Sequence, residues 1–414
     1  MGWRGGEVGG VRCGMLCGVS GSIAQILAPT ILLVIVCNLH PATGQFGPAY
    51  GEDGVSHLLK MGSSKLADWR RRWEQNILTR ARNRYCDTEM GEELAWNTAQ
   101  LLKGFYYGYE ATGDPKWVRM LVDWTDAWVA RAVTEPDGYP GWPRIGAAGT
   151  PADGLDSFYA DSLLGEAMAL LPVMRMSREI LGDPALRDPF GGRAEAYIEL
   201  SRKLFEKWDR RGAWRPTDNG GIISVILPFG IDESTGRWTD GYASRNAPGH
   251  GHSHPDNKAN WVGSWLLAMY DATGERLYRE RAEGWFRLMK SRMKIEDNGT
   301  YRIWNYWEPA GPWDYFSPGV PKHWIGVHPN GGYYDSDVRA IVTAYEAHVV
   351  FDRNDIEHLV ATALEHKRYW TALVPYSRAV QHDFEEHEDP DSWGGLWETP
   401  WYLALQAGRL PSAP

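Results

Sequence analysis

The sequence predicts an all-α fold made of helical hairpins, and two observations lead to this prediction. Between about residues 64 and 211, apolar residues fall at helical spacing, as in Leu101 and Phe105. The turn Tyr-x-Ala-Thr-Gly occurs at 109–113 and again at 270–274, and its glycine suits the left-handed conformation that ends a helix. Hairpins that repeat along one chain close into a toroid or stack as a solenoid.

Two long loops interrupt the helical pattern. They cover 212–254 and 297–334 and are rich in Gly, Pro, Trp, Tyr and His. Strand signals are sparse and lie in or near these loops, at 221–227 and 300–304. Loops of this length in a compact helical domain usually carry function. We therefore look for the functional site there.

The N-terminal segment predicts an export signal. Basic residues precede an apolar stretch, 23–36, and small residues at 42–44 suit cleavage. Pro29 interrupts the apolar stretch, which argues against a retained membrane anchor. We expect a secreted or periplasmic protein with a signal peptide at 1–44 and a single domain at 45–414. The oligomeric state stays open, and no membrane contact is expected after the signal is removed.

The composition excludes some partners and leaves one question open. Lys and Arg number 43 against 53 Asp and Glu, and the net charge of -10 excludes a nucleic-acid-binding surface by bulk charge. The 22 Trp residues outnumber the 10 Phe residues. Such large rings either fill a Trp-rich helical core or line a groove that holds sugars. Without its signal the chain keeps only Cys86, so no internal disulfide is expected.

The loop 246–258, which leads into a predicted helix, concentrates residues that can do chemistry. Three histidines, His250, His252 and His254, occur within five residues. Alternate histidines on a strand can share a zinc ion, or they can act as loop hydrogen-bonders and helix caps. A third interpretation combines them with Asn257 at the helix N-terminus into a carboxylate-binding, proton-transferring site. We expect no metal and no cofactor.

A second concentration lies at 301–334, where aromatic residues alternate with polar ones. In a strand, Arg302, Trp304 and Tyr306 share one face. They would offer a guanidinium for a carboxylate, an indole for a sugar ring and a phenol as a proton shuttle. The alternative is a buried, hydrogen-bonded tyrosine that supports the core.

These residue types fit the β-elimination of a uronic-acid polysaccharide. An enzyme of this kind neutralises the carboxylate beside C5 with Asn, His or Arg donors. A Tyr or His then removes the C5 proton, and a phenol can protonate the leaving oxygen without any metal. The sequence contains no Gly-x-Ser-x-Gly elbow, phosphate loop or dinucleotide fingerprint that would favour another chemistry.

The His/Asn-rich segment 246–261 and the Arg/Tyr/Trp segment 301–334 resemble secreted polysaccharide lyases that act on alginate and glucuronan. The resemblance implies an (α/α) toroid with long functional loops and little β structure. It assigns Asn257, His252 or His254, and Arg302 to neutralising the uronate carboxylate. It assigns Tyr306 to proton transfer as base and acid. The adjacent Asn and His of alginate lyases are absent here, since two residues separate His254 from Asn257.

The expected partner is therefore an acidic polysaccharide. Candidate substrate-binding residues carry an aromatic ring, an imidazole or a carboxyl group: Trp142, His250, Trp304, Trp307, Glu308, His323, His328 and Tyr333. Alternative bases are Tyr301, Tyr315 and Tyr333.

Three other functions stay open on the same residues. A glycoside hydrolase on the same toroid needs two carboxylates roughly 5 to 10 Å apart. Its candidates are Asp161, Glu308, Asp335 and Asp337. A uronate C5-epimerase would share nearly every residue with the lyase. A non-catalytic carbohydrate-binding protein would explain the aromatic residues but not the clustered His and Arg.

Overall fold

The computed structural model describes residues 58–135, 137–145, 158–227, 230–232, 237–239, 251–368 and 370–410. All of them belong to one compact unit, Pro48–Pro414. The predicted signal peptide lies outside the described residues, so the signal, the domain boundary at residue 45 and export stay predictions. In the part of the chain that the structure describes, no helix has the length and apolar character needed to span a membrane.

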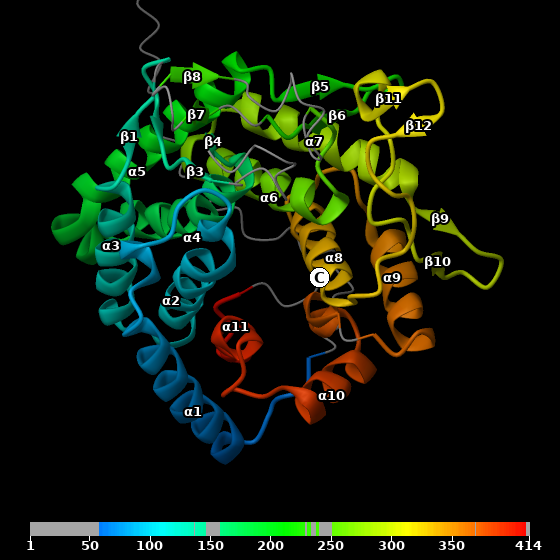
Figure 1. Ribbon diagram of the computed structural model, residues 1–414. Helices are drawn as coiled ribbons and strands as arrows, with labels where there is room; N and C mark the ends of the chain where they lie inside the picture. The colour runs from blue at the N-terminus through cyan, green and yellow to red at the C-terminus, as the bar shows by residue number, and fades with distance from the viewer. Residues whose placement is uncertain are drawn as a thin grey trace, which may run out of the picture. The chain divides into compact units, whose positions relative to one another are not determined.

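Most of the described residues are helical (Figure 1). The α-helices are α1 (Ser63–Ala81), α2 (Ala99–Thr112), α3 (Pro115–Val129), α4 (Leu163–Gly182), α5 (Pro184–Arg210), α6 (Asp256–Thr273), α7 (Arg276–Arg292), α8 (Gly332–Glu346), α9 (Arg353–Glu365), α10 (Arg378–His387) and α11 (Glu398–Gln406). Two shorter helical segments matter for the site, the π-helical turn η2 (Leu94–Thr98) and the 3-10 helix η5 (Thr371–Tyr376).

The strands are short and lie in the connections. They are β1 (Val133–Thr134), β2 (Pro140–Gly141), β3 (Arg144–Ile145), β4 (Phe158–Ala160), β5 (Trp214–Pro216), β6 (Ile222–Ser224), β7 (Gly230–Asp232), β8 (Arg237–Thr239), β9 (Lys294–Ile295), β10 (Tyr301–Arg302), β11 (Tyr315–Ser317) and β12 (Val320–Pro321). An antiparallel sheet has the order β3-β4-β7-β8, and the other strands pair two by two. The strand predicted at 300–304 is therefore shorter than expected and ends at Arg302.

The helices form two layers around a ring. In the inner layer α2 packs on α4, α4 on α6, α6 on α8, and α8 on η5. Helix α11 closes the ring because it packs on α2 and is tied to α8 by the Arg339–Glu398 ion pair. Helices α1, α3, α5, α7 and α9 lie outside these, as Figure 1 shows. This arrangement confirms the predicted toroid and excludes the solenoid.

The two copies of the repeated turn end helices as predicted. Gly113 and Gly274 adopt φ of 66° and 73°, and their N–H groups donate to Tyr109 O and Tyr270 O. Each turn reverses the chain from an inner helix to an outer one, α2 to α3 and α6 to α7. The sequence repeat therefore corresponds to the repeated hairpin of the ring.

Many of the tryptophans fill the space between the two helix layers. Those that are fully buried are Trp73, Trp117, Trp124, Trp128, Trp142, Trp208, Trp265, Trp307 and Trp370. In contrast, Trp96 and Trp324 are exposed. The Trp-rich core therefore accounts for a large part of the tryptophan excess, and only a minority of the indoles are available to a ligand.

The close approach of α4 to the chain before η2 requires glycine at position 165. A Cβ on Gly165 would overlap the carbonyl oxygen of Gly91. We expect Gly165→Ala to lower the free energy of unfolding by about 1–3 kcal/mol, measured by urea denaturation. The matched control is Gly192→Ala in α5, where nothing lies within 4 Å of the new Cβ, and there a gain of up to about 1 kcal/mol is expected. Equal effects at the two positions would contradict the steric explanation.

Candidate functional site

The two long loops meet at the start of α6. Ser253 donates from its N and its Oγ to the buried Asp314 carboxylate, at 2.6 and 2.8 Å. Trp307 Nε1 donates to Ser253 O at 2.9 Å, and the Asp256 N–H donates to Tyr306 O at 3.0 Å. Asp314 thus joins segments that are about sixty residues apart in the sequence, a role that no local motif indicated.

Tyr306 lies in a cluster of rings contributed by the second loop. Its ring centroid is 4.8 Å from His328, 5.3 Å from Tyr333, 5.6 Å from Trp324 and 5.9 Å from His323. Three predicted substrate-binding residues are therefore brought together with Tyr306. Burial raises the pKa of the Tyr306 phenol above its usual value, and Tyr333 and Glu92 add to the effect. The phenol stays protonated at neutral pH and is poorly suited to act as a base.

The two described histidines of the first loop are buried and neutral. His254 Nδ1 lies 2.9 Å from Ser224 Oγ, and burial lowers the pKa of His254 to about 3. His252 Nδ1 lies 2.7 Å from Ser253 O, and burial lowers its pKa to about 4. Neither imidazole supplies a positive charge to a uronate. His250 lies outside the described residues, among which no group of His, Cys, Asp and Glu could hold a metal ion.

Asn257 lies in the first turn of α6 and is buried. Its Oδ1 and Asp256 Oδ2 find no hydrogen-bond partner among the described residues. Asp256 forms an ion pair with Arg292, while burial raises the pKa of Asp256 to about 7. Because the Asp256 N–H donates to Tyr306 O, the first turn of α6 supports the junction between the two loops.

The predicted common face of Arg302, Trp304 and Tyr306 is wrong. Arg302 is exposed and pairs with Glu296 at 2.5 Å, whereas Trp304 is buried and donates from Nε1 to Asp337 at 3.0 Å. The alternation stops because β10 ends at Arg302 and the chain turns Trp304 into the core. Arg302 therefore does not join Tyr306 and the histidines.

Other predicted substrate-binding residues have structural contacts. Trp142 is fully buried and donates from Nε1 to Trp128 O at 2.7 Å, and Trp307 is fully buried as well. These indoles, like Trp304, cannot stack on a ligand. Glu308 accepts from Asn305 Nδ2 at 2.6 Å.

A carboxyl pair lies where α8 and α11 begin. Asp335 is in the first turn of α8, and Glu398 is the first residue of α11. Thr371 Oγ1 lies 3.4 Å from Asp335 Oδ1 and 2.9 Å from Glu398 Oε2. Arg339 forms an ion pair with Glu398, and its guanidinium is 4.0 Å from Asp335. Trp397 Nε1 donates to the other oxygen of Glu398 at 2.8 Å.

The two carboxyl groups have different environments. The Asp335 side chain keeps 24% of its surface exposed, against 9% for Glu398. Desolvation raises the pKa of Asp335 to about 6, with Arg339 acting in the opposite direction. Glu398 is contacted by a guanidinium, an indole N–H and a hydroxyl. Asp335 can thus carry a proton up to about pH 6.

An axial cavity lies beside this pair, inside the ring. One part has a volume of about 20 Å³ and is lined by residues of α2, α4, α6 and α8, including Lys103, Trp261 and Arg339, and by Trp397 directly before α11. An adjoining part has a volume of about 150 Å³ and shares Arg339 with the first. Sequence reasoning named Asp335 but missed Glu398, Arg339 and Lys103, because they stand alone in the sequence and form no motif.

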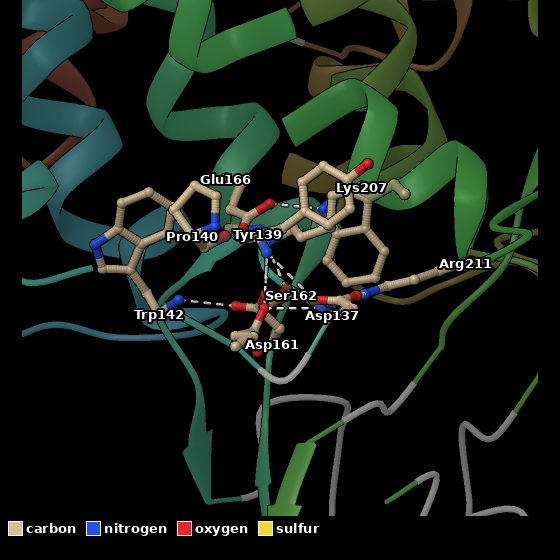
Figure 2. A network of polar contacts seen from close by, with 12 residues as sticks. Asp137, Tyr139, Pro140, Trp142, Asp161, Ser162, Glu166, Lys207 and Arg211 are labelled. Atoms are coloured by element: carbon tan, nitrogen blue, oxygen red, sulfur yellow. Dashed lines mark hydrogen bonds and ion pairs between the residues drawn. The ribbon is translucent and has the colours of Figure 1, made fainter. Parts of the chain in front are cut away.

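A second set of carboxylates surrounds Lys207 on α5 (Figure 2). Lys207 Nζ lies 2.6 Å from Asp161, 2.5 Å from Glu166 and 3.8 Å from Glu135. Arg211 binds Glu135 at 2.8 Å and Asp161 at 3.4 Å. We call these residues the Lys207 network. Their side chains are almost completely buried.

The Lys207 network has no room for a substrate. A Cβ on Gly141 of β2 would overlap Glu135, so the strand lies directly against the carboxyl groups. Asp161 also accepts from Trp142 N at 3.0 Å, and Glu166 from Trp208 Nε1 at 2.6 Å. Of the predicted hydrolase carboxylates, Asp161 thus belongs to a closed network that joins α4, α5 and the β2 strand.

No family model and no curated protein match the chain. Similar solved structures include the GH76A alpha-1,6-mannanase of Salegentibacter sp. HEL1_6, at 11% identity and a TM-score of 0.45, covering 82% of this chain and 98% of that one. An inactive variant of it in complex with alpha-1,6-mannotriose gives the same identity and TM-score over 83% and 99% of the two chains. A family 76 glycoside hydrolase from a bovine Bacteroides thetaiotaomicron strain has 10% identity and a TM-score of 0.46, over 84% and 78%.

The chain is an (α/α) toroid. Its predicted lyase family, its lyase activity and its predicted glucuronan or alginate substrate are wrong, because the similar structures are glycoside hydrolases. The geometry agrees with this correction, since Arg302 is remote, the imidazoles are neutral and Tyr306 is held protonated. The inactive mannanase variant carries substitutions at two consecutive aspartates, whereas this sequence has no Asp-Asp pair. The similarity therefore transfers no catalytic residue.

Proposed function

We propose that the protein is a glycoside hydrolase that acts on a polysaccharide, with Asp335 as general acid and Glu398 as the second carboxylate. The observation that carries this proposal is the convergence of both carboxyl groups on the Thr371 hydroxyl. They come from two inner helices and lie beside an aromatic-lined cavity inside the ring.

Glycoside hydrolysis needs one protonated and one ionised carboxyl group on either side of the scissile bond. Asp335, with its pKa raised to about 6, would protonate the leaving oxygen. Glu398 would attack the anomeric carbon and form a glycosyl-enzyme, which water then hydrolyses with Asp335 as base. Retaining enzymes place the two groups about 5–5.5 Å apart and inverting enzymes about 6.5–9.5 Å. Two carboxyl oxygens that approach one hydroxyl favour the shorter separation and hence retention.

Aromatic rings around the pair would hold the sugar units. Trp397 precedes Glu398 in the chain, and Trp261 lines the same cavity. Trp324 and Tyr333 form a further aromatic cluster with Tyr306 in the second loop. Flat rings with apolar faces pack against sugar rings, which supports a saccharide substrate and leaves its identity to experiment.

A panel of polysaccharides tests the proposal. The purified chain is incubated with neutral polymers, including an alpha-1,6-mannan, and with polyuronates, and both reducing ends and ultraviolet absorbance are followed. New reducing ends without absorbance support hydrolysis, and NMR of the first product then reports retention or inversion. Unsaturated products, or no cleavage of any polymer by the folded protein, would contradict the proposal.

A further inference from the structure

Lys103 of α2 is buried in the ring without an anionic partner. It is 7% exposed, and its ammonium lies 4.5 Å from the Trp261 ring centroid and 4.2 Å from that of Trp397. Within the described ranges, no hydrogen bond or ion pair involves this ammonium. The two indole faces stabilise the charge only in part, and the ammonium keeps three unused donors that face the axial cavity.

A second cation without a carboxylate lines the same cavity. Arg175 of α4 donates to the Tyr107 hydroxyl at 2.9 Å, and among the residues with described positions no carboxylate lies within ion-pair distance of it. Arg175 borders both parts of the cavity, as do Tyr106, Tyr107 and Arg339. Buried cations are normally paired, because an unpaired buried charge is costly. Lys103 is buried and Arg175 is partly buried, so the cavity brings together two cations that have no carboxylate partner among the described residues.

We propose that the axial cavity binds a small oxyanion, a carboxylate, sulfate or phosphate group, between Lys103 and Arg175. Lys103 lines only the narrow part, which has room for one water-sized oxygen atom, whereas Arg175 also lines the adjoining part of about 150 Å³. One oxygen of the anion would therefore enter the narrow part towards Lys103, and its remaining atoms would lie in the wider part beside Arg175. The oxyanion is therefore either a free anion or a substituent of a saccharide. This inference stands apart from the proposed hydrolase, because it requires binding and no catalysis.

The charged groups that line the cavity differ in their partners. Arg339 forms an ion pair with Glu398 and lies 4.0 Å from Asp335. Glu346 faces the wider part, accepts from Tyr376 at 3.1 Å, and has its pKa raised by burial to about 7. Among the described residues that line the cavity, Lys103 and Arg175 are thus the cations that no carboxylate pairs.

Anion binding is expected to be linked to protonation of Lys103. Burial lowers the pKa of Lys103 to about 7. The groups that face it are Arg339 and Asp335 on α8, Glu398 on α11 and Arg175 on α4. An oxyanion next to the ammonium raises this pKa again. Binding above pH 7 should therefore take up a fraction of a proton.

The test is calorimetric titration of the full chain with sulfate, phosphate, acetate, glucuronate and, as the uncharged reference, glucose, at constant ionic strength in chloride. Saturable binding of at least one oxyanion is expected, weakened about 10- to 100-fold in Lys103→Met and in Arg175→Met. The matched control is Lys116→Met, because Lys116 also lies over an indole, 4.7 Å from Trp117, but pairs with Glu74. Binding of glucuronate without sulfate would indicate a saccharide substituent, and comparable binding of inorganic anions would indicate a free ion.

No saturable binding, or equal binding by Lys103→Met and the wild type, would overturn the proposal. If the variants do not fold, titration of the wild type in two buffers of different ionisation enthalpy decides it. Proton uptake above pH 7 is expected, and its absence would also overturn the proposal. Neither readout depends on hydrolysis, so failure of the proposed function and failure of this inference are distinguishable.

Discussion

Asp335→Asn is expected to lower kcat on the cleaved polysaccharide by about 10²- to 10⁴-fold, the usual contribution of a general acid. The amide keeps the shape and the contact with Thr371 but cannot give a proton to the leaving oxygen. The wild-type rate should fall as the pH rises through about 6, because Asp335, with its pKa raised to that value, loses its proton. The rate of the Asp335→Asn variant should not show this decrease with rising pH. Initial rates of reducing-end release against pH measure both effects.

The control for this experiment is Asp188→Asn, which changes an exposed aspartate on α5. It should leave both kcat and the pH profile unchanged. If Asp335 only stabilises the contact between α8 and α11, its replacement would lower the free energy of unfolding and leave kcat within a few-fold of the wild type. That result would refute the assigned role while leaving the fold as described.

Lys207→Met is expected to lower the free energy of unfolding by about 3–5 kcal/mol, because it removes one partner of a buried charge network. Three carboxyl groups, Glu135, Asp161 and Glu166, would remain without their shared cation. Urea denaturation at neutral pH measures the loss. The matched control is Lys203→Met on the exposed face of the same helix, for which a change of no more than about 0.5 kcal/mol is expected.

The pH dependence of this loss has a defined sign. Burial already raises the pKa of Glu135 to about 9 and that of Glu166 to about 8. Against the effect of burial, Lys207 is the main cause that lowers the pKa of Asp161 to about 2. Without Lys207, the pKa of the buried Asp161 rises above that of the unfolded chain. A raised carboxyl pKa costs stability above the unfolded value, about 4. The deficit of Lys207→Met should therefore be largest at neutral pH and shrink below about pH 4. An equal loss of unfolding free energy in Lys207→Met at neutral pH and below pH 4 would argue against the charge explanation.

The ring of helical hairpins could be predicted because the sequence signals for its helices and turns are local. Helical periodicity and the glycines at 113 and 274 depend on a few neighbouring residues, and both appear in the structure as predicted. The resemblance assigned residues of both long loops to one site, and the two loops do meet at the start of α6. Their actual link, the Ser253–Asp314 contact, depends on burial that no sequence pattern reports.

The candidate site itself could not be predicted, for two physical reasons. Protonation depends on solvent exclusion, and clustered histidines give no sign that packing will keep His252 and His254 neutral. The carboxyl pair depends on ring closure, which brings Glu398 to Arg339, 59 positions earlier. Asp335 could be named as an acid at a helix start, but its partner could not.

Closure of the ring by α11 makes the order of synthesis matter. Glu398 belongs to the final helix, so a nascent or C-terminally truncated polypeptide would lack half of the proposed carboxyl pair together with the contact that joins α8 to α11. Such a fragment would lack the proposed activity even if every preceding hairpin were folded. The proposed carboxyl pair would therefore form only after α11 has been synthesised.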